Sequence, residues 1–237
     1  GIAQLAKQFL KNPQEVKLLE QHAENKIRQR FYKVTNENRL TAVATLLKHY
    51  RPLSTLAFCN TKQQCRDLLN VLRENGIQAL TLNGDLEQRE RDQVLIQCAN
   101  NSCSVLVATD VAARGLDIAQ LEAVINVDVT PDPEIHIHRI GRTGRADQQG
   151  WALSLYSPAD KRRLATIAQM MGTTLETHKL SELPEADEAP LVPPMVTLLM
   201  LGGRKDKIRP GDVLGALTGE AGFSSKQVGK TTATDHT

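Results

Sequence analysis

The chain has few aromatic residues, little net charge and no long apolar run. Aromatic residues make up 3% of its 237 residues, which leaves few side chains to stack on nucleic-acid bases. The net charge is +2, from 29 Lys and Arg against 27 Asp and Glu, so any nucleic-acid affinity has to come from local patches. No apolar run is long enough to span a bilayer and no signal peptide is present, which predicts a cytoplasmic protein without membrane contact.

The cysteines lack the spacing of a metal site. Three fall inside predicted strands and helices, the fourth directly follows a predicted strand, and none belongs to a Cys-x-x-Cys pair. This pattern predicts reduced thiols of a cytosolic protein and argues against a zinc site or a disulfide framework. The four are Cys59, Cys65, Cys98 and Cys103.

Two nucleotide-binding elements are also missing. The chain has no G-x-x-x-x-G-K-[ST] loop, so it cannot cradle ATP phosphates as a P-loop protein does. It has no acidic strand end followed by a second acid, the arrangement that would hold magnesium. It does have arginines suited to phosphate, because the planar guanidinium donates two parallel hydrogen bonds. Something other than this chain therefore has to bring the nucleotide.

Short apolar runs alternate with amphipathic stretches between residues 51 and 156. Strands that are apolar throughout and separated by helices predict a parallel sheet covered on both faces, which is a doubly wound α/β domain. Ligands of such a domain bind at the carboxyl ends of the strands. We predict strands over 53–58, 77–82, 103–109, 121–129 and 150–156, and helices over 61–75, 85–100, 132–141 and 157–171.

Residues 181–194 have a different composition, with four acidic residues and four prolines and no helical or strand pattern. This predicts an extended linker stiffened by proline. Beyond it we predict a strand over 195–201, a basic loop leading into a helix over 202–217, and one further strand. Residues 195–237 are too few for an independent core, so we expect a truncated module. The chain begins with Gly1 and not with methionine, from which we expect a piece of a longer protein.

Polar clusters follow the predicted strands. Gln63 and Arg66 lie on the first turn of a helix, and Gly84 in "NGD" allows a close backbone approach. In "ATDVAARGLD" the Thr109 hydroxyl and the first amides of a helix can bind a phosphate, while Asp117 can accept a ribose hydroxyl. The stretch "HRIGRTGR" (138–145) completes the series. Recurrence of such clusters at successive strand ends favours a phosphate-binding surface.

A structural role is the alternative for each residue taken singly. "HRIGRTGR" would then be a solvated basic turn, and Asp85 and Asp117 would be ordinary turn or cap residues. Arg66 would be an exposed helix charge, and His138 a structural histidine. The basic loop of the tail would likewise be a solvated charge run.

These motifs closely resemble the second RecA-like domain of DEAD-box RNA helicases. The resemblance covers about residues 26–180, and residues 1–25 resemble the exit from the family's first RecA-like domain. Residues 202–217 resemble the start of the RNA-binding domain of DbpA-type helicases, a divergent RRM-like α+β module. The matching motifs are "LAFCNT", "QQCR", "NGD", "ATDVAARGLD" and "HRIGRTGR".

The resemblance implies the C-terminal part of an ATP-dependent RNA helicase that unwinds short RNA duplexes. The expected partners are 23S rRNA, during assembly of the large ribosomal subunit, and the first RecA-like domain, which would hold most of the ATP and Mg²⁺. Alternatives are a non-catalytic RNA-binding or scaffold protein, and a DNA translocase of the same superfamily.

Site residues also follow from the resemblance. Arg145 is expected to be an arginine finger on the γ-phosphate, with Arg142 beside it, and His138 is expected to couple the two sites. His136 stands where many members have tyrosine, and Ala146 leaves no aromatic residue to stack on adenine. Expected nucleotide contacts are Asp117, Arg142 and Arg145, and expected RNA contacts are Arg66, Gly84, Thr109, Arg114, Gly115, Arg204, Lys205, Lys207 and Arg209.

Overall fold

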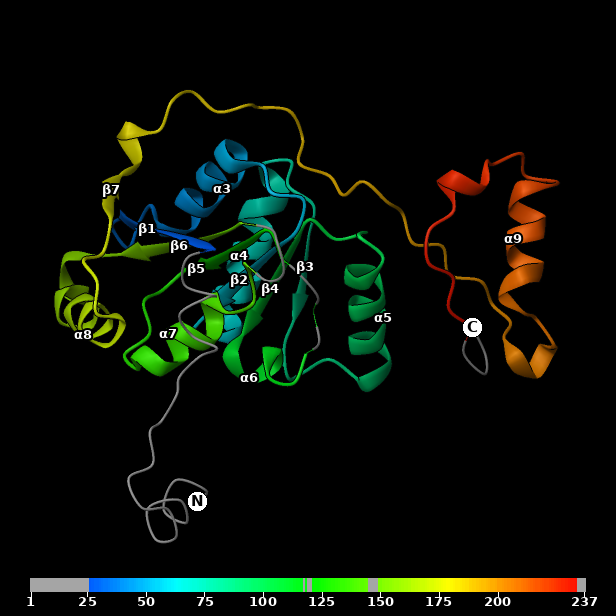
Figure 1. Ribbon diagram of the computed structural model, residues 1–237, viewed down its shortest axis with the longest axis horizontal. Helices are drawn as coiled ribbons and strands as arrows, with labels where there is room; N and C mark the ends of the chain where they lie inside the picture. Colours follow the sequence, from blue (N-terminus) through cyan, green and yellow to red (C-terminus); the bar gives the residue numbers. More distant parts are fainter. Residues whose placement is uncertain (1–25, 117, 119–120, 145–148, 234–237) are drawn as a thin grey trace, which may run out of the picture.

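The centre of the structure is a parallel sheet (Figure 1). The computed structural model describes residues 26–116, 118, 121–144 and 149–233. In this part of the chain seven strands run parallel in the order β3-β4-β2-β5-β6-β1-β7, which confirms the predicted α/β class. The strands are β1 (Ile27–Lys33), β2 (Thr55–Cys59), β3 (Ala79–Leu82), β4 (Val105–Thr109), β5 (Ala123–Asn126), β6 (Gly150–Tyr156) and β7 (Thr177–Lys179).

Helices cover both faces of this sheet. In the fully buried strand β2, Ala57 and Cys59 pack toward α3 and α4, whereas Leu56 and Phe58 pack toward α5 and α6. A strand buried on both sides needs a helical layer on each face, as predicted. The helices are α3 (Arg39–Tyr50), α4 (Lys62–Glu74), α5 (Gln88–Ala99), α6 (Asp110–Ala113), α7 (Pro133–Ile140), α8 (Lys161–Met171) and, in the tail, α9 (Pro210–Thr218).

Helix boundaries follow from the predicted caps. The Thr61 hydroxyl oxygen accepts a hydrogen bond from the Gln64 amide at 3.1 Å and begins α4. Gly76 follows that helix with a φ of +73°, a left-handed conformation that favours glycine. Pro133 occupies the first turn of α7. Ser157 precedes a short 3-10 turn, and α8 begins after it.

Sequence patterns did not predict β1, α3 or β7. Strand β1 has neither alternation nor a continuous apolar run, because four of its seven residues are charged or polar and its buried residues, Phe31 and Tyr32, are adjacent. Helix α3 begins with Arg39, which is only 7% exposed and donates a hydrogen bond to the Val127 carbonyl at 2.9 Å. A buried arginine at this position is invisible to a search for apolar periodicity.

The tail departs from prediction. The strand predicted over 195–201 is wrong, because these residues have no strand partner among the described residues, and Val196 and Leu201 are 81% and 86% exposed. An extended apolar segment needs a neighbour to satisfy its backbone groups. The further strand is likewise absent over residues 219–233. The predicted helix is present as α9, after a 3-10 turn at Arg204–Asp206.

The linker (residues 181–194) is attached to the sheet domain by polar contacts. It leaves β7 and passes α3 on its way to the tail (Figure 1). Lys48 of α3 forms an ion pair with Glu188 at 2.5 Å. The Arg51 guanidinium donates hydrogen bonds to the carbonyls of Ala189 at 2.9 Å and Pro190 at 3.1 Å. These contacts hold the linker's second half along the end of α3.

A buried leucine completes this attachment. Leu191 is 5% exposed and belongs to the core between α3, α4 and the sheet. Its amide donates to the Gly76 carbonyl at 3.0 Å, and its carbonyl accepts from the Gln78 amide at 2.9 Å. Leu191 thus extends the sheet by one bridge to Ile77 beside β3. The linker is therefore docked, which its proline-rich composition did not predict.

We predict that Leu191→Asp releases the linker without unfolding the sheet domain. Losing a buried leucine costs about 2–5 kcal/mol, enough for at least a tenfold rise in the population with a detached linker. A protease that cuts after glutamate should then cleave at Glu185 and Glu188 at least about tenfold faster. Val192→Asp is the control, since Val192 is 58% exposed. Equal cleavage rates for the two variants would contradict docking through Leu191.

Candidate nucleic-acid interface

Three polar clusters meet at one edge of the sheet. Because the strands are parallel, the carboxyl ends of β2, β3 and β4 lie at the same edge. Asn60 follows β2, Asn83 follows β3 and Asp110 follows β4. The sequence prediction of neighbouring polar strand ends is correct for these three.

The fourth predicted cluster is not at a strand end. Residues 138–145 begin inside α7, and Thr143 pairs with Leu121 ahead of β5. Helix α7 starts after β5 ends and returns toward the beginning of β6, so Thr143 and Gly144, which follow the helix, lie beside Leu121 and Ile27, ahead of β5 and at the start of β1. The physical reason is the crossover itself, because a helix between two parallel strands has to run back along them.

Arg139 joins the clusters, although as part of "HRIGRTGR" it was expected to have no separate role. It is 2% exposed, and its guanidinium forms two hydrogen bonds with the Asp110 carboxylate at 2.7 and 2.6 Å. It also donates to the Asp128 carbonyl at 3.0 Å and to Asn60 Oδ1 at 3.3 Å, and it lies 5.1 Å from the Phe58 ring centroid. This one side chain ties α7 to the ends of β2, β4 and β5.

Two cations border the turn after β3. Lys62, at the start of α4, forms an ion pair with Asp85, and the two side chains are 49% and 60% exposed. Gly84 lies between them and is exposed, and a Cβ there would be 3.9 Å from Lys62 Nζ. On the next turn of α4, Arg66 donates to Gln63 Oε1 at 2.8 Å. This corner therefore presents a bare backbone beside exposed positive charge, which suits a phosphate chain.

The end of β4 presents a hydroxyl and a second exposed cation. The Thr109 hydroxyl oxygen accepts from the Ala112 amide at 3.4 Å, so its own proton can be donated to a ligand. That contact uses one of the amides that we expected to face a phosphate. Arg114 and Gly115 follow α6 and are exposed. Gly115 has a φ of +76°, which only glycine adopts readily, and its Cβ position is open space.

The predicted nucleotide residues fall only partly within the described residues. Asp117 and Arg145 lie outside them. Arg142 is half-buried and donates to the Leu116 carbonyl at 2.7 Å, next to position 117 along the chain. Gly144 has a φ of +68°, and a Cβ there would lie 2.5 Å from Ile27 Cγ1. The glycine is therefore needed for close packing on β1.

The two histidines of α7 differ in environment. His138, the expected coupling residue, is exposed. His136 is fully buried, stacks on Phe31 at 5.7 Å, and lies 3.1 Å from Gln29 Oε1 through Nε2. Burial, with a smaller contribution from the Arg139 charge, lowers the pKa of His136 to about 4. His136 is therefore neutral at physiological pH and serves packing.

The described residues contain no group of three or more His, Cys, Asp or Glu placed to hold a metal ion. All four cysteines are free thiols. A hydrogen bond with Cys65, together with burial, raises the pKa of the Cys59 thiol. None of the helices in the described ranges is both long and apolar enough to cross a lipid bilayer.

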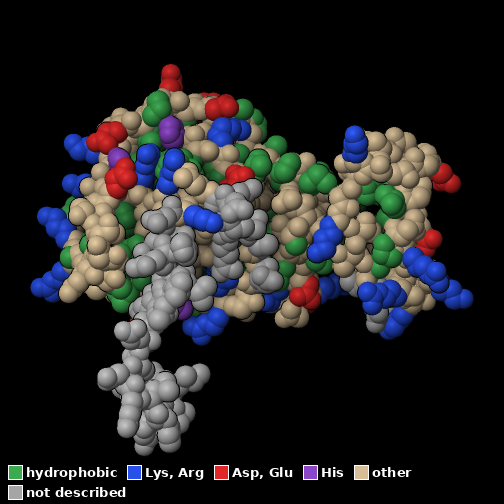
Figure 2. All heavy atoms as spheres, in the orientation of Figure 1, with side chains coloured by type: hydrophobic (Ala, Val, Ile, Leu, Met, Phe, Trp, Pro, Cys, Tyr) green, Lys and Arg blue, Asp and Glu red, His purple; other side chains and the backbone are tan. Residues whose placement is uncertain are grey.

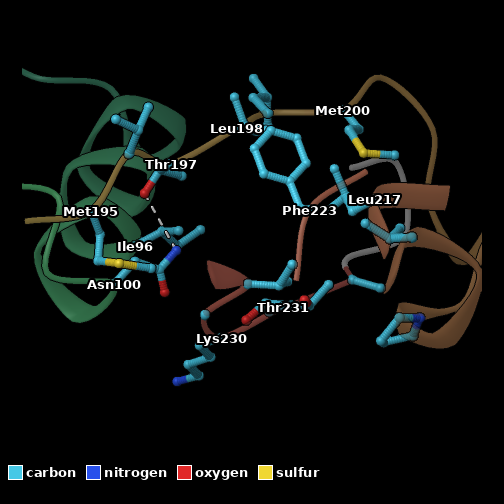
Figure 3. A pocket seen from close by; sticks show the side chains of 18 of the residues that line it. Ile96, Asn100, Met195, Thr197, Leu198, Met200, Leu217, Phe223, Lys230 and Thr231 are labelled. Carbon is cyan, nitrogen blue, oxygen red and sulfur yellow. Dashed lines mark hydrogen bonds between the residues drawn. The ribbon is translucent and has the colours of Figure 1, made fainter. Parts of the chain in front are cut away.

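The tail carries a basic loop and a separate apolar groove. The groove, of about 610 Å³, opens between the end of α5, residues 194–200 and α9 (Figure 3). Thr197 donates to Ser102 Oγ at 2.8 Å, which holds this segment near α5. In the loop, Asp206 accepts from the Gly203 amide at 2.9 Å and closes a 3-10 turn. The four exposed cations of the loop are Arg204, Lys205, Lys207 and Arg209.

Comparison with known proteins identifies the family. The helicase conserved C-terminal domain matches residues 38–147, and the DbpA RNA-binding domain matches residues 197–237. The chain is 43% identical to the ATP-dependent RNA helicase DbpA of Escherichia coli, over 97% of this chain and 50% of that protein. It is 30% identical, with a TM-score of 0.63, to the E. coli DEAD-box protein SrmB in a complex with RraA, covering 74% of this chain and 99% of that one. This chain belongs to the DbpA-type DEAD-box helicase family.

Other DEAD-box proteins agree with this assignment. DbpA of Bacillus subtilis is 31% identical over 99% of this chain and 53% of its own length. Saccharomyces cerevisiae Dbp5, solved with RNA and ADP BeF3, is 28% identical with a TM-score of 0.65 over 76% of this chain and 49% of that one. The chain thus spans about half the length of the DbpA relatives it matches.

We predict that Arg139→Met destabilises this DEAD-box chain by about 3–5 kcal/mol, because it leaves Asp110 and several carbonyls without their partner. Urea denaturation monitored by circular dichroism measures the loss. The double variant Arg139→Met/Asp110→Asn should recover part of it, since the unpaired charge is removed too. Strictly additive losses would show that the two side chains are not coupled.

We predict an acid-dependent stability loss from His136. A folded-state pKa of about 4 against an unfolded value near 6.5 means that the unfolded chain binds the proton more readily. The stability that this difference in pKa gives the folded chain is fully present above pH 6.5. It falls by up to about 3 kcal/mol as the pH is lowered toward 4. His136→Phe should reduce the pH dependence of unfolding in that window, and His138→Gln should leave it unchanged. If the free energy of unfolding changed equally with pH in wild type and in His136→Phe, the lowered pKa of His136 would be refuted.

Proposed function

We propose that this chain is the C-terminal half of an ATP-dependent RNA helicase, in which the sheet domain binds the RNA backbone at the carboxyl edge. The observation that carries the proposal is the convergence of phosphate-type groups from three strand ends, joined by Arg139. The proposed parts are the exit from a first RecA-like domain (1–25), the second RecA-like domain (26–180), the linker (181–194) and the start of an RRM-like module (195–237).

RNA contacts in this proposal are directed at the backbone. Arg66 and Arg114 supply fixed charges, and the Thr109 hydroxyl supplies a neutral donor. Gly84 and Gly115 keep the main chain exposed, so that phosphates can approach the amides. Groups of this kind position a strand without reading its bases. The sheet domain therefore binds RNA of any sequence, and selectivity has to come from the tail.

The nucleotide contact of this proposal that lies within the described residues is Arg142, which follows the C-terminal end of α7. Arg142 would bind ATP phosphates together with Asp117 and Arg145, with Arg145 as the arginine finger. Its hydrogen bond to the Leu116 carbonyl uses one of five N–H groups, so donors remain for a phosphate. ATP and Mg²⁺ would be held mainly by the first RecA-like domain. An arginine acting there stabilises charge on the γ-phosphate as it is transferred to water.

Arg139 offers a physical link between the two sites. It lies in the last turn of α7, three residues before Arg142, which follows the helix, and its partner Asp110 follows Thr109 directly. When ATP and RNA draw two RecA-like domains together, the proposed nucleotide and RNA contacts move as one rigid unit. RNA held at both domains is then bent, and a short duplex opens. Hydrolysis releases the γ-phosphate contact and lets the domains separate.

The tail would direct this activity to its target. Its four exposed cations in the loop 204–209 suit weak, salt-dependent attraction to RNA. Similarity to DbpA leads us to propose 23S rRNA and large-subunit assembly as the context. Free thiols and the charged surface (Figure 2) are compatible with a cytoplasmic location, which we also propose.

We predict that Arg66→Gln/Arg114→Gln weakens binding of this chain to single-stranded RNA. Each lost phosphate contact should lower the slope of log affinity against log salt by about 0.7, so the double variant should lose about 1.4. Fluorescence anisotropy at several salt concentrations measures both affinity and slope.

Arg73→Gln is the matched control, because Arg73 lies at the far end of the same helix α4 and donates to the Ala79 carbonyl. It should bind RNA like wild type. Equal binding by the double variant and wild type would place the RNA elsewhere. If the Arg73 control lost as much RNA affinity as the double variant, the loss would be explained by the lower net positive charge and not by specific phosphate contacts.

A further inference from the structure

Two lysines face each other across neighbouring strands at the edge of the sheet. Lys33 of β1 and Lys179 of β7 are direct partners in the parallel register, and both are exposed. Side chains on directly opposite residues of paired strands point to the same face, and like charges there are unfavourable. Packing and folding therefore gain nothing from this pair.

A second unfavourable charge arrangement lies at the start of α8. The helix begins Lys161-Arg162-Arg163, and apart from its N-cap residue Asp160 it has no acidic residue in its first turn. Positive charge at a helix N-terminus opposes the helix dipole. Arg163 is held by Asp160 at 3.2 Å and by the Val129 carbonyl at 3.2 Å. Lys161 and Arg162 are exposed.

These two arrangements share one face of the sheet. Residues two apart on a strand point the same way, so Lys33 lies on the side of Phe31. Phe31 packs with Ile167 and Leu164 of α8. Figure 2 shows Lys and Arg side chains gathered along the margin that carries β7 and α8. We define the α8 surface as Lys33, Lys161, Arg162 and Lys179.

Nearby carboxylates are engaged with other cations. Asp160 binds Arg163 and the Ser157 hydroxyl. Glu176 contacts Arg30 and His178. Within the described ranges, none of the four α8-surface cations forms an ion pair with a carboxylate. The surface thus has uncompensated positive charge, placed where it costs stability.

We propose that the α8 surface is an outer binding site for the phosphate backbone of the RNA strand that leaves the carboxyl edge. This inference rests on the proposed function. Lys33 and Lys179 end β1 and β7, so they lie at the same edge as Thr109 of β4. Four strand spacings of about 4.8 Å, roughly 19 Å in all, separate β4 from β1. A single strand spans this distance with a few nucleotides.

The chemistry of the surface favours a polyanion over a folded protein partner. Protein interfaces bury a core of aromatic and apolar side chains. On α8 and β7, Met170 is the one large apolar residue that is strongly exposed, at 45%. Flexible lysines spaced over three elements suit successive phosphates of a chain, and counterion release would supply the binding free energy.

The test compares a short and a long single-stranded RNA, of about 4 and about 20 nucleotides, so that the short one fills the carboxyl-edge site alone and the long one also reaches the α8 surface. We expect Lys33→Gln/Lys179→Gln to bind the short RNA like wild type. Its affinity for the long RNA should fall, with a salt slope smaller by about 1.4. Its Tm should equal or slightly exceed that of wild type, because repulsion is relieved. Lys161→Gln/Arg162→Gln should behave in the same way from a different element.

Arg28→Gln is the control, since Arg28 is an exposed cation at the opposite end of β1. If both double variants bound the long RNA as tightly as wild type, the α8 site would be overturned. Binding of the short RNA by wild type would still support the proposed function. If wild type bound neither the short nor the long RNA, the proposed function would be refuted as well. If the variants lost affinity for polyglutamate but not for the long RNA, the surface would be assigned to an acidic protein partner instead.

Discussion

The fold of the site depends on burying one guanidinium. Arg139 carries its charge to a position only 2% exposed, and desolvating an ion costs several kcal/mol unless its hydrogen bonds are satisfied. The carboxylate of Asp110, the Asp128 carbonyl and the Asn60 amide oxygen together meet that demand. Because these partners come from the ends of three strands, satisfying the arginine fixes those ends relative to α7. The exposed polar residues next to these strand ends are thereby held in fixed positions, where they can contact a ligand.

Much of the fold could be predicted from local chemistry. Thr61 and Gly76 bound α4, and the apolar run that contains β2 indicated a strand covered on both faces. Three of the four polar clusters also follow strand ends as predicted. Arg139 could not be found this way, because a buried arginine and an exposed one look alike in sequence. The docking of Leu191 was hidden too, since one leucine among prolines has no periodicity.

The tail shows the limit of reasoning from composition. Residues 195–201 have the apolar character of a strand, but strand formation is a pairwise property, and the described residues provide no partner. Lys33 and Lys179 show the converse. Their register, which no sequence pattern announced, brings together two charges that local rules would keep apart. Departures of this kind concentrate at functional surfaces, where binding offsets their cost in stability.

The docked linker also limits how far the tail can move from the sheet domain. If the linker were free along its whole length, the tail would explore a wide volume around the end of β7. Because Leu191 is anchored beside β3, the tether is only the few residues that follow it. A shorter tether raises the effective concentration of the tail near the sheet domain. Under the proposed function, the RNA contacts of the sheet domain and of the tail would then act together as a single bivalent binder with high avidity.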